Sequence, residues 1–176
     1  MEVWFIILMI VVIAELIMSG SWYPFYFRTG IPLFRRSFHF LEQPTISPET
    51  LSEKFHSSFA DPLLFHAIGP REIGFREKFF SFRLFNYTPV MHGLILIGQL
   101  QHKVTVTGYA NWFVIFFAAT FIAIHLPFAQ LEVHYVPESI VVFIYLGILY
   151  VIQTVRFNKV FKILEQKYRQ GMQQRI

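Results

Sequence analysis

Hydrophobic positions gather into three long runs, and the segments between them are of mixed polarity. The runs are Val3 to Ser19, Trp112 to Phe128 and Ile140 to Thr154, each about 15 to 20 residues long. A transmembrane helix needs about 20 predominantly apolar residues to cross a hydrocarbon core about 30 Å thick. The three runs therefore predict three transmembrane helices, each extending modestly into its flanks.

The first run lies where a cleavable signal peptide would lie. A signal peptide carries a basic segment ahead of its apolar stretch, whereas this run follows Met1 and Glu2, which bring no positive charge. We therefore expect an uncleaved membrane anchor.

Basic residues occur in only two parts of the chain. Nine of the 15 Lys and Arg residues lie between Gly20 and Ala110, and six follow Thr154. Because the cytoplasmic segments of membrane proteins are enriched in Lys and Arg, both parts are expected to be cytoplasmic and the N-terminus to lie outside. We expect an integral membrane protein of a bacterial inner membrane that contacts membrane lipids through its spans.

The segment between the first two spans is too polar to cross a bilayer and too apolar to remain disordered, so it should fold. A short helix is predicted from Pro48 to about Ser58, because Ser47 can cap it and proline suits its first turn. Short β-branched or aromatic stretches separated by turn residues follow, and they predict an antiparallel meander. These stretches are 63–68, 73–76, 79–85, 90–97 and 103–109. The strict alternation of Lys103 to Thr107 marks a strand, with 90–97 as its expected partner.

These patterns predict a membrane α+β protein with three transmembrane helices and a small antiparallel-β-rich cytoplasmic domain inserted between the first and the second. The expected parts are an N-terminal anchor (1–20), a cytoplasmic α+β domain (21–110), a transmembrane helical hairpin (111–155) and a basic amphipathic C-terminal helix (156–176). In layout alone, a membrane-linked meander resembles bacterial membrane proteins with pleckstrin-homology-like domains. The sequence carries no motif specific to that family.

The C-terminal segment continues the third run without a helix breaker, and its apolar residues recur at helical spacing. They are Phe157, Val160, Phe161, Leu164 and Tyr168. Three placements are open: the helix lies on anionic lipid, packs on the chain's own cytoplasmic domain, or binds a partner. The candidate contacts to anionic lipid are Arg35, Arg36, Arg156, Lys159 and Lys162. Because topology already accounts for a basic tail beside a membrane, no nucleic acid partner is expected.

Phenylalanine is unusually abundant, with 22 residues in the chain and 13 of them between positions 21 and 110. A domain of this size leaves much of its surface exposed and cannot easily bury so many rings. We expect some of them to meet lipid or another protein. The candidate interaction surface comprises Trp22 and Tyr23 after the first span, together with Phe79, Phe80 and Phe82 in a predicted strand.

Glu15 is the strongest single candidate for a functional residue, because it lies inside the first apolar run. An ionised carboxylate in that setting is costly unless it is paired, hydrated or protonated. Three roles remain open: packing or assembly of helices, a position at the membrane interface, and the handling of protons or ions.

Nothing in the sequence marks a catalytic or metal centre. His125, Glu132, His134 and Glu138 fall within 14 residues and are weak metal candidates, because their spacing matches no known ligand motif. Cysteine is absent, which excludes disulfides and thiolate chemistry. The usual hydrolase, metalloprotease, phosphate-loop and dinucleotide motifs are also absent. We therefore expect no cofactor and no enzymatic activity.

The leading hypothesis is a non-catalytic accessory or scaffold subunit. Its spans and its Phe-rich domain would bind a larger membrane protein complex or further copies of the chain. One alternative is a protein that binds lipid or another hydrophobic ligand. Another is a component of an ion-coupled carrier, or a membrane enzyme, that uses Glu15.

Overall fold

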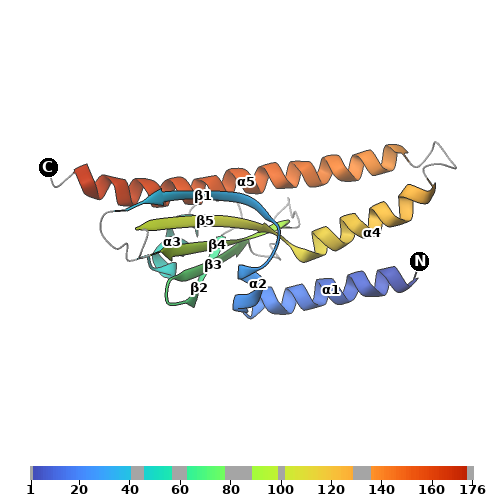
Figure 1. The fold of residues 1–176 in the computed structure, drawn as a ribbon, viewed down its shortest axis with the longest axis horizontal. Helices are drawn as coiled ribbons and strands as arrows, with labels where there is room; N and C mark the ends of the chain where they lie inside the picture. Colours follow the sequence, from blue (N-terminus) through green and yellow to red (C-terminus); the bar gives the residue numbers. More distant parts are fainter. Residues whose placement is uncertain are drawn as a thin grey trace.

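The computed structural model describes residues 2–40, 46–56, 63–77, 89–98, 102–128 and 136–173. They form an α+β fold in which α1, α4 and the first half of α5 project from one end of an antiparallel sheet (Figure 1). The helices are α1 (Glu2–Gly20), α2 (Pro24–Arg28), α3 (Pro48–His56), α4 (Trp112–Phe128) and α5 (Val136–Gln173). The strands are β1 (Pro32–His39), β2 (Leu63–Gly69), β3 (Glu72–Glu77), β4 (Met91–Gly98) and β5 (Lys103–Ala110).

The five strands lie in the order β1-β5-β4-β3-β2, and every neighbouring pair is antiparallel. Strands β2 to β5 form a meander, and the predicted pairing of the last two strands is confirmed, with Ile95 opposite Val106. The helix predicted from Pro48 is confirmed as α3. The predicted strand 79–85 lies outside the described residues.

Strand β1 was not predicted from the sequence. It pairs with β5 at the edge of the sheet, with Arg35 opposite Thr107. Its buried apolar residues, Phe34 and Phe38, are four positions apart with Arg36 between them, so the strand lacks a clean alternation of polar and apolar side chains. An edge strand tolerates this pattern because much of its surface faces solvent.

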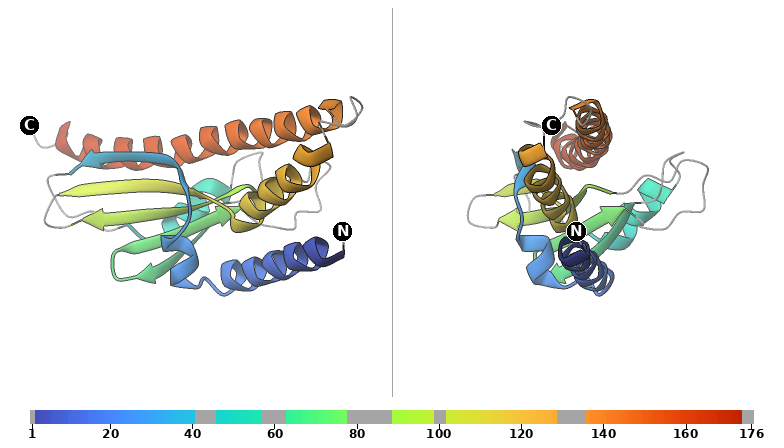
Figure 2. Two further views of the ribbon diagram at one scale, coloured as in Figure 1. Left: turned by 45° about the vertical axis from the view of Figure 1, so that its right-hand side comes forward. Right: turned by 90° about the vertical axis from the view of Figure 1, so that its right-hand side faces the viewer.

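Helix α5 is continuous from Val136 and lays its second half across one face of the sheet (Figure 2). Phe157, Val160, Phe161 and Leu164 are buried there. Of the three placements left open for this helix, packing on the chain's own domain is therefore the one observed. Burial of one apolar stripe against a sheet is the usual source of stability for an amphipathic helix.

Two facing glycines make room for the aromatic centre of this core. Gly93 and Gly108 are paired across β4 and β5. A Cβ at Gly93 would overlap the Phe75 ring, and one at Gly108 would lie 2.6 Å from the Phe157 ring. The Phe75 and Phe157 rings fill the space that the missing side chains leave, with centroids 4.8 Å apart.

The opposite face of the sheet carries α2, which follows α1 after a tight turn at Trp22, where φ is +55°. Tyr26 and Phe27 of α2 are fully buried. Phe27 packs so closely on the sheet that a Cβ at Gly74 would lie 3.0 Å from its ring. Helix α2 thus closes the end of the sheet next to α1.

Two helices in the described part are long and apolar enough to cross a membrane. The stretches are Val3–Gly20 in α1 and Ile140–Tyr168 in α5, while α4 contributes a shorter apolar stretch, Trp112–Ala123. Only 11% and 17% of the residues in the most apolar 18-residue window of each longer stretch are buried inside the protein, so these windows leave most of their apolar surface uncovered. The described part thus has two helices that could span a membrane, where the sequence predicted three spans.

Candidate functional site: a buried polar cluster between helices and sheet

The Glu15 carboxylate caps the N-terminus of α4 from another helix. Its Oε1 accepts hydrogen bonds from the Trp112 backbone N–H (3.0 Å) and the Tyr26 hydroxyl (2.6 Å), and its Oε2 accepts one from the Phe113 N–H (2.6 Å). The first N–H groups of a helix lack partners within it and form the positive end of its dipole. Glu15, which is 1% exposed, therefore supplies both acceptors and negative charge to this helix end.

Asn111 lies immediately before α4 and links the helix start to the sheet. Its Nδ2 donates to the Pro89 carbonyl (2.7 Å), so its Oδ1 is the atom that faces the His92 Nδ1 (2.9 Å) and the Tyr26 hydroxyl (3.2 Å). Since an amide oxygen only accepts, the His92 proton must reside on Nδ1, where it is donated to Asn111. The orientation of one amide thus determines the tautomer of the histidine.

His92 and Tyr26 are uncharged partners in this cluster. Burial lowers the pKa of His92 to about 4, although the hydrogen bond to Asn111 opposes the shift. Burial, reinforced by the nearby Glu15 carboxylate, raises the pKa of Tyr26 well above its ordinary value. The two rings stack with centroids 4.1 Å apart. At neutral pH both side chains are therefore neutral, and Tyr26 retains the proton that it donates to Glu15.

A cation lies at the edge of the same cluster. The Arg76 guanidinium lies 4.9 Å from the centre of the Trp22 ring, which is stacked on Phe27 and on His66 at 5.2 Å each. Burial lowers the pKa of Arg76, but a guanidinium stays charged at neutral pH. Trp22, predicted as part of an interaction surface, is thus packed against the protein's own side chains, whereas Tyr23 is 55% exposed.

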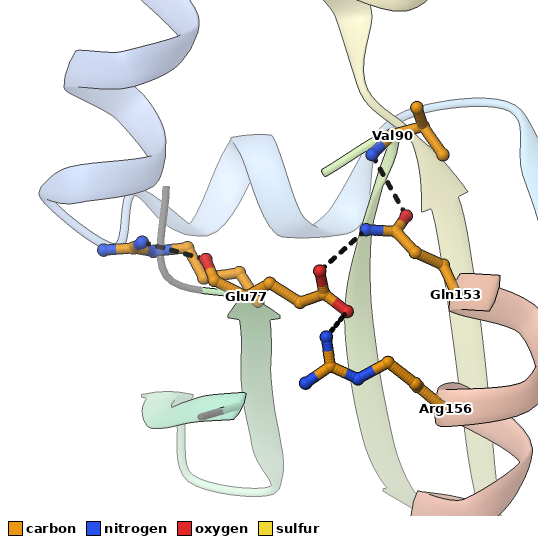
Figure 3. A network of polar contacts seen from close by, with 5 residues as sticks. Glu77, Val90, Gln153 and Arg156 are labelled. Atoms are coloured by element: carbon orange, nitrogen blue, oxygen red, sulfur yellow. Dashed lines mark hydrogen bonds and ion pairs between the residues drawn. The ribbon is translucent and has the colours of Figure 1, made fainter. Parts of the chain in front are cut away.

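A second polar network joins α5 to the sheet on the face that α5 covers (Figure 3). Glu77 Oε1 accepts from Arg156 (2.5 Å), and its Oε2 accepts from Gln153 Nε2 (3.1 Å). The Gln153 Oε1 in turn accepts from the Val90 backbone N–H (3.1 Å). Both Glu77 and Gln153 are buried, so the network fixes α5 against β3 and the start of β4.

The candidate lipid contacts are placed in different surroundings. Arg35, Lys159 and Lys162 are exposed, and the structure leaves them available to lipid. Arg36 is also exposed, with its guanidinium 5.9 Å from the centre of the Phe161 ring. Arg156 differs from the others, because its side chain is only 15% exposed and is paired with Glu77.

Several predicted site residues cannot be placed. Phe79, Phe80, Phe82, Glu132 and His134 lie outside the described residues. His125 belongs to α4, and its side chain is outside the described part as well. Among the residues that are described, no group of three or more His, Cys, Asp or Glu side chains could hold a metal ion.

Sequence reasoning singled out Glu15 but missed the residues around it. Neither His92 nor Tyr26 lies in a sequence motif that marks it as a neighbour of Glu15. One usable signal was present: Asn111 directly precedes the second apolar run, the position of a helix cap. Glu15, Tyr26, His92 and Asn111 come from four separate segments, and no spacing rule connects those segments along the chain.

The cluster can hold a negative charge, or a proton, at a helix terminus shielded from water. No protein-family model, curated protein or solved structure matches this chain.

Proposed function

We propose that the chain is an integral membrane protein with three transmembrane helices and that it serves as a non-catalytic accessory or scaffold subunit of a larger membrane complex. The observation that carries this proposal is the large exposed apolar surface of α1 and α5. On α1 it includes Val3, Phe5, Ile6, Ile10, Ile13 and Ile17, and on α5 it includes Ile140, Val141, Ile144, Ile148, Val151 and Val155. Surfaces of this extent need lipid or partner helices to cover them.

The path of the chain supports α4 as the third span. Helix α4 has 17 residues and is roughly 25 Å long, slightly less than the ~30 Å hydrocarbon core. It begins beside the sheet, next to the end of α1, and α5 returns to the sheet from the far end (Figures 1 and 2). If α1 and α5 cross a membrane, α4 must carry the chain to the other side.

A group of exposed apolar side chains, here called the collar, lies in and beside α2 and at the start of β1, at the end of the sheet nearest the spans. It consists of Tyr23, Phe25, Ile31 and Leu33, which are 38–59% exposed, with the exposed Arg35 beside them. Aromatic and apolar side chains next to a basic residue suit the headgroup region of a bilayer. The collar supports a position of the sheet directly at the inner membrane surface.

The buried polar residues support a role without catalysis. Glu15 is engaged in capping α4, and Glu77 is engaged by Gln153 and Arg156. These acids thus hold helices in place, which suits a protein whose surface presents a binding face.

Purification from native membranes in mild detergent, followed by intact-complex mass spectrometry, tests the proposal. We expect a partner, or further copies of the chain, in fixed stoichiometry. Recovery solely as a lone, monodisperse protomer contradicts the scaffold role. Orientation is tested separately with Ser37→Cys in this cysteine-free chain. Ser37 is exposed on β1, and labelling by an impermeant reagent from outside intact cells contradicts a cytoplasmic sheet.

The collar also favours a second candidate, a protein that binds lipid at the bilayer surface. In that case Phe25→Ser with Leu33→Ser should lower the amount of co-purified lipid while the protein stays folded. Ser37→Ala, at another exposed position of β1, is the matched control and should retain the lipid. Equal lipid content in both variants excludes this second role for the collar.

A further inference from the structure

Among the described residues, the hydrogen-bond donors to the buried acid Glu15 are all neutral. The three donors are a tyrosine hydroxyl and two backbone N–H groups. A buried carboxylate is usually compensated by a cation, because desolvation of an isolated charge is costly. Here the positive end of the α4 dipole takes that place, and a dipole compensates less than a full positive charge. The site is therefore balanced between holding a charge and holding a proton.

The Tyr26 hydroxyl lies within hydrogen-bond distance of the acceptors on Glu15 and Asn111 but has only one proton to donate. Glu15 Oε1 is 2.6 Å away and Asn111 Oδ1 is 3.2 Å away. With Glu15 ionised, the shorter, charge-assisted bond takes the proton. The Asn111 oxygen still accepts a hydrogen bond from His92 Nδ1. In the ionised state, therefore, the Glu15 carboxylate, the Tyr26 hydroxyl and the Asn111 oxygen all have a partner.

Addition of one proton to Glu15 produces a second complete arrangement. The protonated Oε1 donates to the Tyr26 oxygen, and Tyr26 turns its own proton to Asn111 Oδ1. A carbonyl oxygen has two lone pairs, so Asn111 can accept from Tyr26 and His92 together. The Phe113 N–H keeps Oε2 as its acceptor. The change takes one proton from solvent and breaks no covalent bond.

Asn111 is suited to this role because it cannot rotate freely. Its Nδ2 donates to the Pro89 carbonyl at 2.7 Å, which keeps Oδ1 directed at Tyr26 and His92. A rotated amide would place a second donor against Tyr26 and would remove the acceptor that the protonated state requires. The Pro89 contact thus holds the acceptor in place in advance.

We infer that Glu15 is a proton-binding site at the junction of α1 and α4, in which Tyr26 and Asn111 keep both the ionised and the protonated carboxyl fully hydrogen-bonded. In the part of the chain that the structure describes, the titratable or charged side chains that face it, directly or through these two residues, are Tyr26 on α2, His92 on β4, Tyr109 on β5 and Arg76 on β3. Helix α4 presents its backbone N–H groups and Asn111. Proton binding removes the negative charge from the N-terminus of α4 and so weakens the attachment of α4 to α1.

Infrared spectroscopy of the purified full chain in lipid tests this inference without reference to any partner, so its outcome is independent of the scaffold proposal. Exposed carboxylates are already ionised above about pH 5.5. In that range we expect a C=O stretch of a protonated carboxyl whose intensity rises as pH falls. Absence of any titrating band in the wild type overturns the inference.

Variants identify which carboxyl group gives the titrating band. Glu15→Gln should abolish the band, and Glu72→Gln should keep it, because Glu72 lies in a surface ion pair with Arg28. Persistence of the band in Glu15→Gln overturns the assignment. Tyr26→Phe keeps the Glu15 carboxyl but removes the hydroxyl that lies between it and Asn111. We expect its C=O frequency to change and its titration midpoint to move up by about one pH unit, a tenfold change in proton affinity. An unchanged frequency and midpoint overturn the role of Tyr26, even if Glu15→Gln does not fold.

Discussion

Glu77 at the end of β3 and Arg156 in α5 form an ion pair at 2.5 Å in which the Glu77 side chain is 3% exposed and that of Arg156 15%. Gln153, one helical turn before Arg156, completes the contact to the same carboxylate. Two residues on one face of α5, Gln153 and Arg156, thus both donate hydrogen bonds to the Glu77 carboxylate. The pair joins α5 to β3 of the sheet.

Loss of one member of this pair should be costly. Arg156→Met leaves the Glu77 carboxylate buried with only part of its partners, and we expect a loss on the order of 3 kcal/mol in the free energy of unfolding. Denaturant unfolding in detergent measures it. Lys159→Met, an exposed base on the same helix, is the matched control and should change stability little. The double variant Glu77→Gln, Arg156→Met should recover part of the loss, since no buried charge remains. Equal stability of Arg156→Met and the control contradicts a structural role for the pair.

Gly108 should tolerate no side chain. A Cβ there would lie 2.6 Å from both the Phe157 ring and the Met91 methyl group. We expect Gly108→Ala to lower the free energy of unfolding by about 1–3 kcal/mol, because the core must shift to relieve the overlap. Gly147→Ala is the control, since nothing lies within 4 Å of a Cβ at that position. Comparison of the two melting temperatures gives the result, and equal melting temperatures contradict the packing described for the core.

The sequence was sufficient for elements whose signal is local. The apolar runs located α1 and α4, the helical spacing of Phe157 to Leu164 located the packed face of α5, and the alternation of β5 identified its pairing with β4. Each signal arises from a periodicity that one element carries by itself.

Strand β1 and the polar cluster around Glu15 could not be predicted, because they depend on contacts between segments that are distant in the sequence. Strand β1 is specified by its pairing with β5 across more than sixty intervening positions, and its own pattern is interrupted by Arg36. The polar cluster likewise depends on contacts between distant segments. Glu15 was recognisable as an acid in an apolar run, but its acceptance of the Trp112 and Phe113 N–H groups depends on how α1 and α4 lie together. Sequence periodicity identifies a face to be buried and does not identify what will bury it.

His92 should make the stability of the protein depend on pH. Its pKa of about 4 in the folded protein lies below the ordinary value of 6.5. As pH falls through about 6.5 the unfolded chain takes up a proton, whereas the folded protein resists it until about pH 4. The free energy of unfolding should therefore fall across this window, by up to something on the order of 3 kcal/mol, and level off below it.

Unfolding measured at a series of pH values tests this dependence by difference. His92→Phe keeps a ring against Tyr26 but cannot titrate. The part of the pH dependence of the unfolding free energy that comes from His92 should therefore disappear, even though the variant is less stable overall. His39→Gln, at an exposed position of β1, is the control and should keep the wild-type slope. A wild-type slope in His92→Phe contradicts the assignment.

Removal of the Glu15 carboxylate should loosen the beginning of α4 before it affects the sheet. The Trp112 and Phe113 N–H groups lose their acceptor in Glu15→Ala, and loss of a helix cap costs about 1–2 kcal/mol. Hydrogen exchange at these two amides should accelerate by about tenfold or more, as expected for a loss of this size. Exchange in β5, for example at Val106, should stay close to wild type, because that strand is held by β1 and β4 on either side. Glu15→Gln keeps an amide oxygen as acceptor and should give an intermediate rate at Trp112 and Phe113. If Glu15→Ala leaves both amides as protected as in the wild type, the carboxylate is not what secures the start of α4.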